Sequence, residues 1–495
     1  MMNPPSLEGI MMSNNNSHEE VLEVRKFYEN KTLFITGATG FLGKFICEKL
    51  LTACNVKRIY VLLREKKGQT ISERCKALRN DQLFKFRVDP AKLDLIVPIA
   101  GDISLPDLGI SLKDRVLLVK ETNVIIHSAA TVKFDETLSV AMNINVLGTQ
   151  AVLKLCSQVQ NLQSFLYVST AFTSSHLKRL EEQPLPPTAD PYEVVKLMKE
   201  HDTQVFDTEI YESVRGGHPN SYTFTKSLSE QIVRDFTLSM KIPTAIAKPS
   251  IIMSPVSEPI ELYVDGLTQG TPAVGAGLGI ALIRVLPGKL SNRFPAIPVD
   301  ICTNHILIAA AEAATFDVTE NNARNYGAFN TTDNLITIDT AFTSTFKGVL
   351  EYPTMKALRP PSMVQFTSFD FVYKIQVIFF ELFFAAFFDL LLVMTGDKAK
   401  LMRILNKSHK TISVLGFFLS QDWKVSGSNC LRAHNRLSKE EQQLFYCDLS
   451  NIDWKAFFFK YWLGIRKWGL REDLSNLQQA KKRLKRYVLN AKKTD

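Results

Sequence analysis

A tyrosine and a lysine stand four positions apart in SYTFTKSLSE, residues 221–230. If this segment is helical, Tyr222 and Lys226 share one face, because residues i and i+4 are neighbours on a helix surface. A tyrosine with an ordinary pKa of about 10 is a poor acid–base group at neutral pH unless something favours its anion. The ammonium group of Lys226 would do so, and it could also hold the ribose of a nicotinamide. The pair therefore predicts proton transfer to or from a substrate.

A hydroxyl group precedes this pair in the run YVSTAF, residues 167–172. Thr170, in preference to Ser169, is expected to point its hydroxyl at a substrate carbonyl beside Tyr222. The structural alternative is that Thr170 caps a helix or a turn. Taken as catalytic, Thr170, Tyr222 and Lys226 form a set suited to chemistry at a carbonyl group.

Three glycines, Gly37, Gly40 and Gly43, join an apolar run to an amphipathic pattern in TLFITGATGFLGKFICEKL, residues 32–50. In a dinucleotide site they would permit a tight turn, the approach of a phosphate and close packing of the helix, whose N-terminus attracts a pyrophosphate. The spacing G-x-x-G-x-x-G departs from G-x-G-x-x-G, and glycines also end strands for structural reasons. The strand before and the helix after favour the nucleotide. Expected cofactor contacts at this turn and at neighbouring strand ends are Gly37, Thr39, Gly40, Phe41, Leu42, Gly43, Ala129 and Pro249.

The end of the second apolar run, VLLREKKGQT, indicates which dinucleotide binds. NAD sites usually place an acid about 20 residues beyond the glycines, to bind the ribose 2′-hydroxyl. Here Arg64, Lys66 and Lys67 surround the single acid Glu65, which favours the 2′-phosphate of NADPH over NADH. A solvated basic turn is the alternative. Asp102, which closes the third run, is expected either to bind the adenine amine or to cap a helix.

The elements that position these residues alternate between short apolar runs and helical patterns. Strands buried on both faces and helices in alternation predict βαβ units, a doubly wound parallel sheet and a Rossmann-type α/β fold. The predicted strands are 32–37, 58–63, 95–101, 123–129, 164–170 and 243–250, and the predicted helices are 41–54, 70–86, 138–159 and 222–240.

The whole chain has 495 residues, 45% of them apolar and 22% charged, which predicts two or three folded domains. Seven scattered cysteines without a C-x-x-C argue against a disulfide framework and a zinc site. The N-terminus is polar, so no secretory signal is expected. The predicted divisions are a disordered segment 1–27, a dinucleotide-binding domain with insertions 28–345, a mostly helical domain 346–480 and a basic tail 481–495.

Four segments depart from the alternating pattern. The polar stretch 174–220 and the Gly/Pro-rich stretch 255–298 read as insertions of the kind that cover substrates. The stretch 373–394 is strongly apolar but contains two acids, so a buried amphipathic helix and a membrane-dipping or spanning segment both stay open. The basic run 481–493 reads as a solvated helix face, or as a contact for an anionic membrane or substrate; nucleic acid is the poorest fit.

The motifs together resemble the extended short-chain dehydrogenase/reductase family and, within it, the fatty acyl-CoA reductases, most of all the insect members. The segment DWKAFFFKYWLGIRKWGLRED (453–473) is similar to that family's C-terminal domain, and the likeness runs from about residue 28 to about 475. The other motifs that carry it are TGATGFLGK, YVLLREKKGQT with Arg74 after it, GDISLPDLGIS, NVIIHSAATVKFDE, NVLGT, YVSTAF, YTFTKSLSE and KPSII.

This resemblance implies a four-electron reduction of a long-chain acyl-CoA to a primary alcohol and free CoA, by two NADPH through an aldehyde. It makes Tyr222 the proton donor. It also implies an apolar tunnel for the acyl tail, which we assign to the two insertions and the C-terminal domain, and a place at an intracellular membrane, of the endoplasmic reticulum or the peroxisome. The family usually has Arg where this chain has Lys248, and often Tyr where it has Phe172.

Two other classes of protein are weighed against this one. A 3β-hydroxysteroid dehydrogenase or a nucleotide-sugar epimerase would share the glycine turn and the Tyr/Lys pair, but Arg64 and the segment 453–473 argue against both. A non-catalytic nucleotide-binding scaffold or membrane-tethered regulator would be expected to have lost Tyr222, Lys226 or one of the glycines. All of these residues are present.

Overall fold

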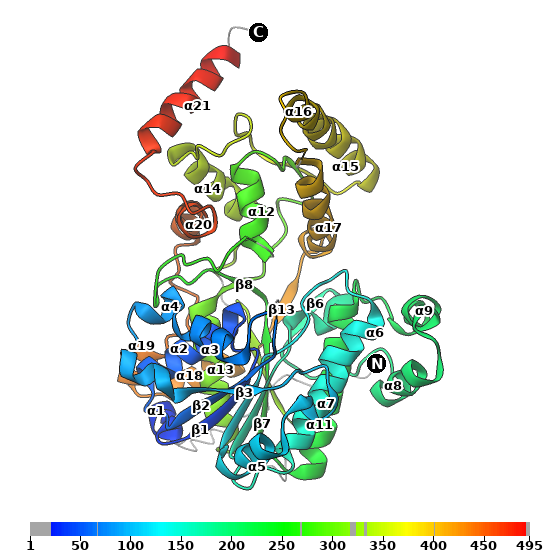
Figure 1. Ribbon diagram of the computed structural model, residues 1–495, viewed down its shortest axis with the longest axis vertical. Helices are drawn as coiled ribbons and strands as arrows, with labels where there is room; N and C mark the ends of the chain where they lie inside the picture. Colours follow the sequence, from blue (N-terminus) through cyan, green and yellow to red (C-terminus); the bar gives the residue numbers. More distant parts are fainter. Residues whose placement is uncertain are drawn as a thin grey trace, which may run out of the picture.

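The computed structural model describes residues 21–491 except 67, 268–269, 317–322, 331–333 and 400. Its centre is a seven-stranded sheet in the order β11-β7-β5-β4-β1-β2-β3, with every neighbouring pair parallel (Figure 1). The predicted doubly wound α/β fold is confirmed. The strands are β1 Thr32–Thr36, β2 Arg58–Leu63, β3 Ile96–Ala100, β4 Val124–His127, β5 Ser164–Val168, β7 Thr244–Pro249 and β11 Arg324–Ala328.

Alternate side chains of these strands enter two separate cores. Leu33 and Ile35 of β1 pack on one face of the sheet, whereas Phe34 between them packs on the other. This is the period of two that a β-strand imposes, and both faces are apolar because helices cover both.

Helices α2 Phe41–Ala53 and α13 Val299–Ala313 cover one face, and α7 Gly148–Cys156 and α11 Ser221–Met240 cover the other. The predicted helix 70–86 is two helices, α3 Ile71–Arg79 and α4 Gln82–Lys85. The predicted helix 138–159 begins as α6 Leu138–Ala141, continues as the π-helix η3 Met142–Leu147 and ends as α7. Helices α5 Leu112–Glu121 and α13 are among those that had no individual prediction.

The insertion 174–220 forms β6 Arg179–Glu181, α8 Pro191–Glu200, α9 Thr203–Val205, η5 Phe206–Ile210 and α10 Tyr211–Val214. It packs against α6 and α11, and β6 pairs in parallel with β13 Lys424–Ser426, near the other end of the chain. The insertion 255–298 contains α12 Gly270–Gly279 and β9 Val285–Pro287 and ends in β10 Ala296–Pro298, which pairs with β8 Ile251–Met253.

The C-terminal third is mostly helical, as predicted, and divides between two places. One group of helices lies with α12 beyond the carboxyl end of the sheet (Figure 1). This group comprises α14 Ile338–Glu351, α15 Asp370–Val377, η6 Ile378–Leu382, α16 Phe383–Met394, α17 Leu401–Ser420, α20 Trp454–Gly464 and α21 Leu477–Ala491, and β12 Gln365–Thr367 in the same region pairs with β9. The other group, α18 Asn429–Asn435 and α19 Lys439–Leu444, returns to the sheet, where α18 packs on α13.

The N-terminal segment is ordered from residue 21, whereas disorder was predicted through residue 27; residues 1–20 lie outside the described part. Leu22 bridges to Leu437, and helix α1 Val24–Tyr28 buries its first and last side chains. The sequence pattern missed this segment because its partners, helix α13 and the region of Leu437, lie hundreds of residues away. At the other end, helix α21 begins before the predicted tail at 481, and 492–495 are not described.

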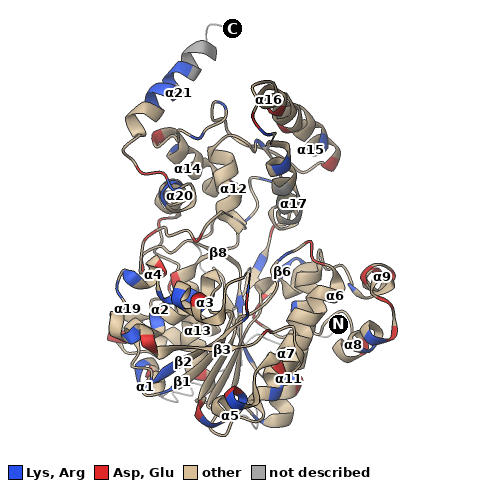
Figure 2. Cartoon of the chain, in the orientation of Figure 1, with Lys and Arg blue, Asp and Glu red and all other residues tan. Residues whose placement is uncertain are grey.

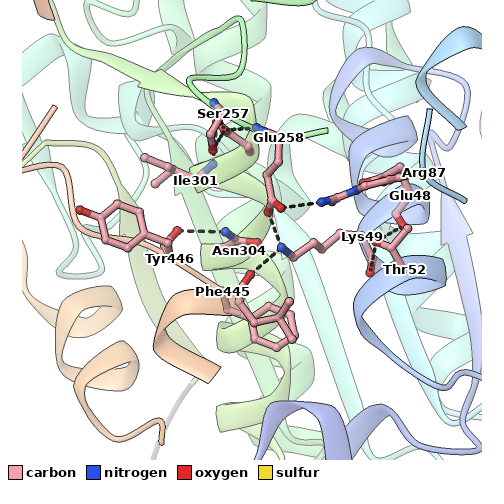
Figure 3. A network of polar contacts seen from close by, with 12 residues as sticks. Glu48, Lys49, Thr52, Arg87, Ser257, Glu258, Ile301, Asn304, Phe445 and Tyr446 are labelled. Carbon is pink, nitrogen blue, oxygen red and sulfur yellow. Dashed lines mark hydrogen bonds and ion pairs between the residues drawn. The ribbon is translucent and has the colours of Figure 1, made fainter. Parts of the chain in front are cut away.

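A buried polar network ties the first helix after the glycine turn to two distant segments (Figure 3). Lys49 of α2 pairs with Glu258 of the second insertion and donates to the Leu444 carbonyl at 2.5 Å. Arg87 bridges the two acids Glu258 and Glu48, at 2.7 and 2.5 Å. The polar side of α2 is thereby fixed to the rest of the fold, while its N-terminus lies at the edge where the strands end.

Candidate active site

The turn between β1 and α2 accepts only glycine at two of its positions. Gly37 has a φ of +79°, and a Cβ there would lie 2.8 Å from the backbone nitrogen of Ala129. A Cβ on Gly43 would lie 2.2 Å from the Gly37 carbonyl oxygen, so α2 packs directly on the turn. Gly40 is the N-cap of α2. This cradle of backbone at a helix N-terminus, which any side chain would fill, fits the pyrophosphate of a dinucleotide.

Two guanidinium groups lie beside this turn, at the end of β2. Arg74 donates to the Arg64 carbonyl and also to the Thr39 hydroxyl, at 3.4 Å. Burial and the nearby charge of Arg64 together lower the pKa of Arg74. Arg64 itself is half exposed, so the pair presents positive charge where the adenosine ribose of a dinucleotide would lie. Lys67, the other expected cation, falls outside the described residues.

Asp102, at the end of β3, already has partners in this arrangement. One of its oxygens accepts from the backbone and hydroxyl of Ser104, at 2.9 and 2.8 Å, and the other accepts from Arg64 at 3.0 Å. Burial raises the pKa of Asp102, but these hydrogen bonds outweigh it and hold the pKa below its usual value. The carboxylate therefore both orders the turn after β3 and orients Arg64.

Tyr222 lies in the first turn of α11, which Asn220 caps by accepting from the Thr223 backbone at 2.9 Å. The ring of Phe134 packs edge-on against it, at 5.5 Å between centroids. Burial raises the pKa of Tyr222 to about 12, and a hydrogen bond with Thr170 acts against that rise. Thr170 therefore lies near the Tyr222 hydroxyl, and it also has the capping role given as the alternative, because its hydroxyl accepts from the Phe172 backbone N–H at 3.4 Å.

Lys226 is buried one turn further along α11. Its ammonium donates to the Val168 carbonyl at 2.7 Å and lies over the Tyr167 ring, 4.5 Å from the centroid. Burial lowers the pKa of Lys226 to about 7, against the opposing charge of Glu230. We expected Lys226 to act on Tyr222, but the pKa of Tyr222 responds to burial and to Thr170. The ammonium donates to the carbonyl at the end of β5 instead.

Glu230, one turn beyond Lys226, is the centre of a buried cluster that our sequence analysis missed. Ser169 donates to it at 2.5 Å, and the Lys248 ammonium lies 3.3 Å away. Arg234 lies 3.5 Å from the same carboxylate. Ser169 therefore turns away from Tyr222, which leaves Thr170 as the hydroxyl at the site. The signal in the sequence was the repeated spacing of four, 222, 226 and 230, on one face of the helix.

Asn145 was also missed, and it holds the catalytic helix in place. Its side chain accepts from the Thr131 backbone and donates to the Thr225 hydroxyl, both at 2.9 Å. It lies within the π-helix η3, a distortion that often occurs at functional sites. The loop after β4 is thereby fixed to α11 within one turn of Tyr222.

An apolar cavity lies next to this site. Phe418 forms part of its wall, and the Phe418 ring packs 5.7 Å from Phe134, which in turn contacts Tyr222. Among the described residues, none from 174–220 lines the cavity; the second insertion and the C-terminal helices supply most of it. The lining is Ile251, Met253, Thr271, Val274, Gly275, Leu278, Phe294, Ala341, Phe342, Thr345, Leu415, Phe418, Leu419, Phe458 and Tyr461.

Comparison with known proteins gives relatives along nearly the whole chain. Two family models described as Male sterility protein match residues 35–306 and 380–472. The chain is 32% identical to Fatty acyl-CoA reductase wat of Drosophila melanogaster and 31% identical to Fatty acyl-CoA reductase 1 of Homo sapiens. Each match covers 94% of this chain and 89% of the relative.

Solved structures with the same fold are more distant. The terminal R domain of the myxalamid PKS-NRPS pathway superposes with a TM-score of 0.54 at 18% identity, covering 88% of this chain and 90% of that one. The reductase domain of a nonribosomal peptide synthetase from Mycobacterium tuberculosis gives 0.53 at 19% identity, covering 88% and 92%. At these identities the likeness shows the fold alone.

Proposed function

The chain belongs to the fatty acyl-CoA reductases, alcohol-forming oxidoreductases with a nicotinamide-binding fold, and we propose that it reduces a long-chain acyl-CoA to a primary alcohol with two NADPH. The observation that carries the proposal is the juxtaposition of three features at one edge of the sheet. These are the glycine cradle at 37–43, the Thr170–Tyr222 pair and the apolar cavity behind Phe134.

Bound NADPH supplies the hydride for each of the two reductions. As negative charge develops on the thioester oxygen, Thr170 and Tyr222 donate hydrogen bonds to it. Tyr222 then gives up its proton as general acid, and the charge of Lys226 favours the phenolate that remains. The hemithioacetal collapses to release CoA, and the aldehyde accepts the second hydride at the same two donors. The balance is one acyl-CoA, two NADPH and two protons to one alcohol, one CoA and two NADP⁺.

Product analysis tests this function directly. Purified protein would be given acyl-CoAs of graded length with NADPH or NADH, and the extracted lipids would be separated by gas chromatography. We expect fatty alcohol and two NADPH consumed per alcohol formed. Accumulated aldehyde with one NADPH consumed would restrict the enzyme to the first reduction. Neither product from any acyl-CoA would overturn the proposal.

The specificity for NADPH is assigned to Arg64 and Arg74. Replacing both with alanine is expected to weaken NADPH binding at least about a hundredfold, because each charge-assisted hydrogen bond to a phosphate is worth about 1.5–3 kcal/mol. NADH, which has no 2′-phosphate, should bind nearly as before. Fluorescence titration of both cofactors measures this. Arg58→Ala, at the opposite end of β2, is the matched control. Equal losses for the two cofactors would contradict the assignment.

The acyl tail is assigned to the cavity behind Phe134, whose apolar walls are typical of sites for lipophilic ligands. With the tail in the cavity, the thioester would lie on the Tyr222 side of Phe134. The cavity would then limit the length of the chain that the enzyme accepts.

Ala341→Phe fills part of this cavity from α14 and should shift the products toward shorter alcohols. We expect kcat/KM for the longest substrates to fall about tenfold or more, since overfilling an apolar site costs about 1–3 kcal/mol. Gas chromatography of the alcohols measures the shift. Lys347→Phe, exposed on the same helix, is the control. An unchanged chain-length profile would place the acyl tail elsewhere.

A further inference from the structure

The helix from Asp370 to Met394 presents an uncovered apolar face. Among the described residues it is the one helix long and apolar enough to cross a membrane, with a mean hydropathy of 2.4. Phe379 and Phe383 on this face are 71% and 72% exposed. Exposed large apolar side chains along and just before the helix are Phe369, Phe371, Val372, Ile375, Ile378, Phe379, Phe380, Phe383, Phe387, Leu390, Leu391, Val393 and Met394. Contiguous apolar surface of this extent marks an interaction site.

The two acids within this helix face inward, onto the protein. Glu381 is fully buried and accepts from the backbone of Arg284 and Val285, at 2.6 and 2.8 Å, while its other oxygen lies 2.8 Å from Nε2 of His409. Asp389 accepts from the first backbone N–H groups of α17 at 2.9 Å. The acids therefore leave the outer face apolar and hold the helix against the body.

The chain enters and leaves this helix on the same side. Before it, β12 pairs with β9; after it, α17 runs back toward the sheet and leads to β13, which pairs with β6 (Figure 1). A single crossing of a bilayer would put β13 on the opposite side of the membrane from its partner β6, and α20 on the opposite side from α14, on which it packs. The folded structure thus accommodates a helix that lies along a surface and not one that spans.

Basic charge lies at the same end of the molecule. Helix α21 and the apolar helix both lie at the end of the molecule away from the sheet, on opposite flanks of it, and α21 carries a run of lysines and arginines (Figure 1, Figure 2). Lys481 pairs with Glu351 at 2.6 Å, which ties α21 to α14. Lys482, Lys485 and Arg486 are exposed. Basic residues at the same end of a molecule as an exposed apolar helix complement an anionic lipid surface.

We propose that this end of the molecule docks in the plane of one leaflet of an anionic bilayer. In this arrangement, the outer face of 370–394 enters the level of the acyl chains and α21 contacts the headgroups. Helix α17, which packs against α16, also supplies Leu415, Phe418 and Leu419 to the cavity wall. The docked helix and the cavity wall are therefore joined through α17 and through the apolar cluster in which Tyr373 packs near Val274, and acyl-CoA and alcohol would exchange with the leaflet along this route. This last step rests on the proposed function, whereas the docking does not.

Co-sedimentation of the full-length protein with vesicles tests the docking without substrate or cofactor. Binding is expected to phosphatidylcholine vesicles that contain phosphatidylserine, and to be weaker to phosphatidylcholine alone. Phe379→Glu/Phe383→Glu should lower binding at least tenfold, with no change in melting temperature. Lys482→Glu/Lys485→Glu/Arg486→Glu should remove the preference for phosphatidylserine. Phe86→Glu, an exposed phenylalanine after α4, is the control and should bind normally.

Three outcomes would overturn the proposal. Unchanged binding of the Phe379→Glu/Phe383→Glu variant would remove the apolar face from the contact. Loss of a dimer in that variant, together with no vesicle binding by the wild type, would mean that a second copy covers the face. Protease-sensitive tags at the two termini that lie on opposite sides of a membrane would show a spanning helix; tags on one side support in-plane docking.

Discussion

Tyr222→Phe is expected to lower kcat for acyl-CoA reduction by about 10²–10⁴-fold, the usual contribution of a positioned general acid. The substitution removes one oxygen atom and keeps the ring that packs on Phe134. The remaining donor, Thr170, can still hydrogen-bond to the developing oxyanion but has no acidic proton suited to transfer. Gas chromatography of the alcohol formed under saturating substrate measures the loss.

The affinity for NADPH should be unchanged in this variant, because the glycine cradle and Arg64 lie elsewhere. Tyr192→Phe is a matched control, since it removes a tyrosine hydroxyl that bonds to Asp235 on the surface. If Tyr222→Phe and the wild type form alcohol at equal rates, the reductase activity is supported but another group must supply the proton.

The second large effect that we expect is a loss of activity at high pH, caused by deprotonation of Lys226. Its pKa of about 7 means that the ammonium is present below pH 7 and lost above it, whereas an ordinary lysine stays charged to about pH 10. If the charge supports the Tyr222 phenolate, kcat/KM should fall about tenfold per pH unit above pH 7. Lys226→Arg keeps the charge throughout and should flatten this limb even if its rate is lower. A wild-type profile that is level from pH 6 to pH 9 would contradict this role.

A substitution at Glu230 separately tests the role of the Lys226 charge. Its carboxylate raises the pKa of Lys226, so Glu230→Gln should move the falling limb to lower pH while keeping a hydrogen bond to Ser169. The same variant leaves the Lys248 cation without its counterion and should also lower the melting temperature, as removing one member of a buried pair does. A lower melting temperature with an unmoved pH profile would make Glu230 purely structural.

Local sequence patterns predicted six of the seven strands of the central sheet, because buried parallel strands are continuous apolar runs between turn residues. The strand they missed, β11, is RNYGA, which has little apolar character and gains its place by pairing with β7. Helix α13 was missed for the opposite reason. Every one of its residues is buried, so it has no polar face to reveal a helical period.

Part of the candidate site could also be predicted from local sequence patterns. The glycine turn and the Tyr222–Lys226 pair are local spacings on single elements, so the sequence displays them directly. The Glu230 cluster joins β5, β7 and α11, and only the folded sheet brings its members together. The inward orientation of Glu381 likewise depends on tertiary packing. The sequence shows an acid in an apolar run but not whether its side chain faces the protein or the outside.

The pairing of β6 with β13 has a consequence for how the protein is made. Arg179 pairs with Lys424, 245 residues later (424 − 179), and Leu22 bridges to Leu437. During synthesis, β6 therefore waits with an open edge until most of the chain has left the ribosome, and contacts of such sequence separation form slowly. The reductase half can begin to fold early but is completed only by the last segments, so a chain that stops after the sheet would leave unpaired edges and the partner surface of α13 exposed to aggregation.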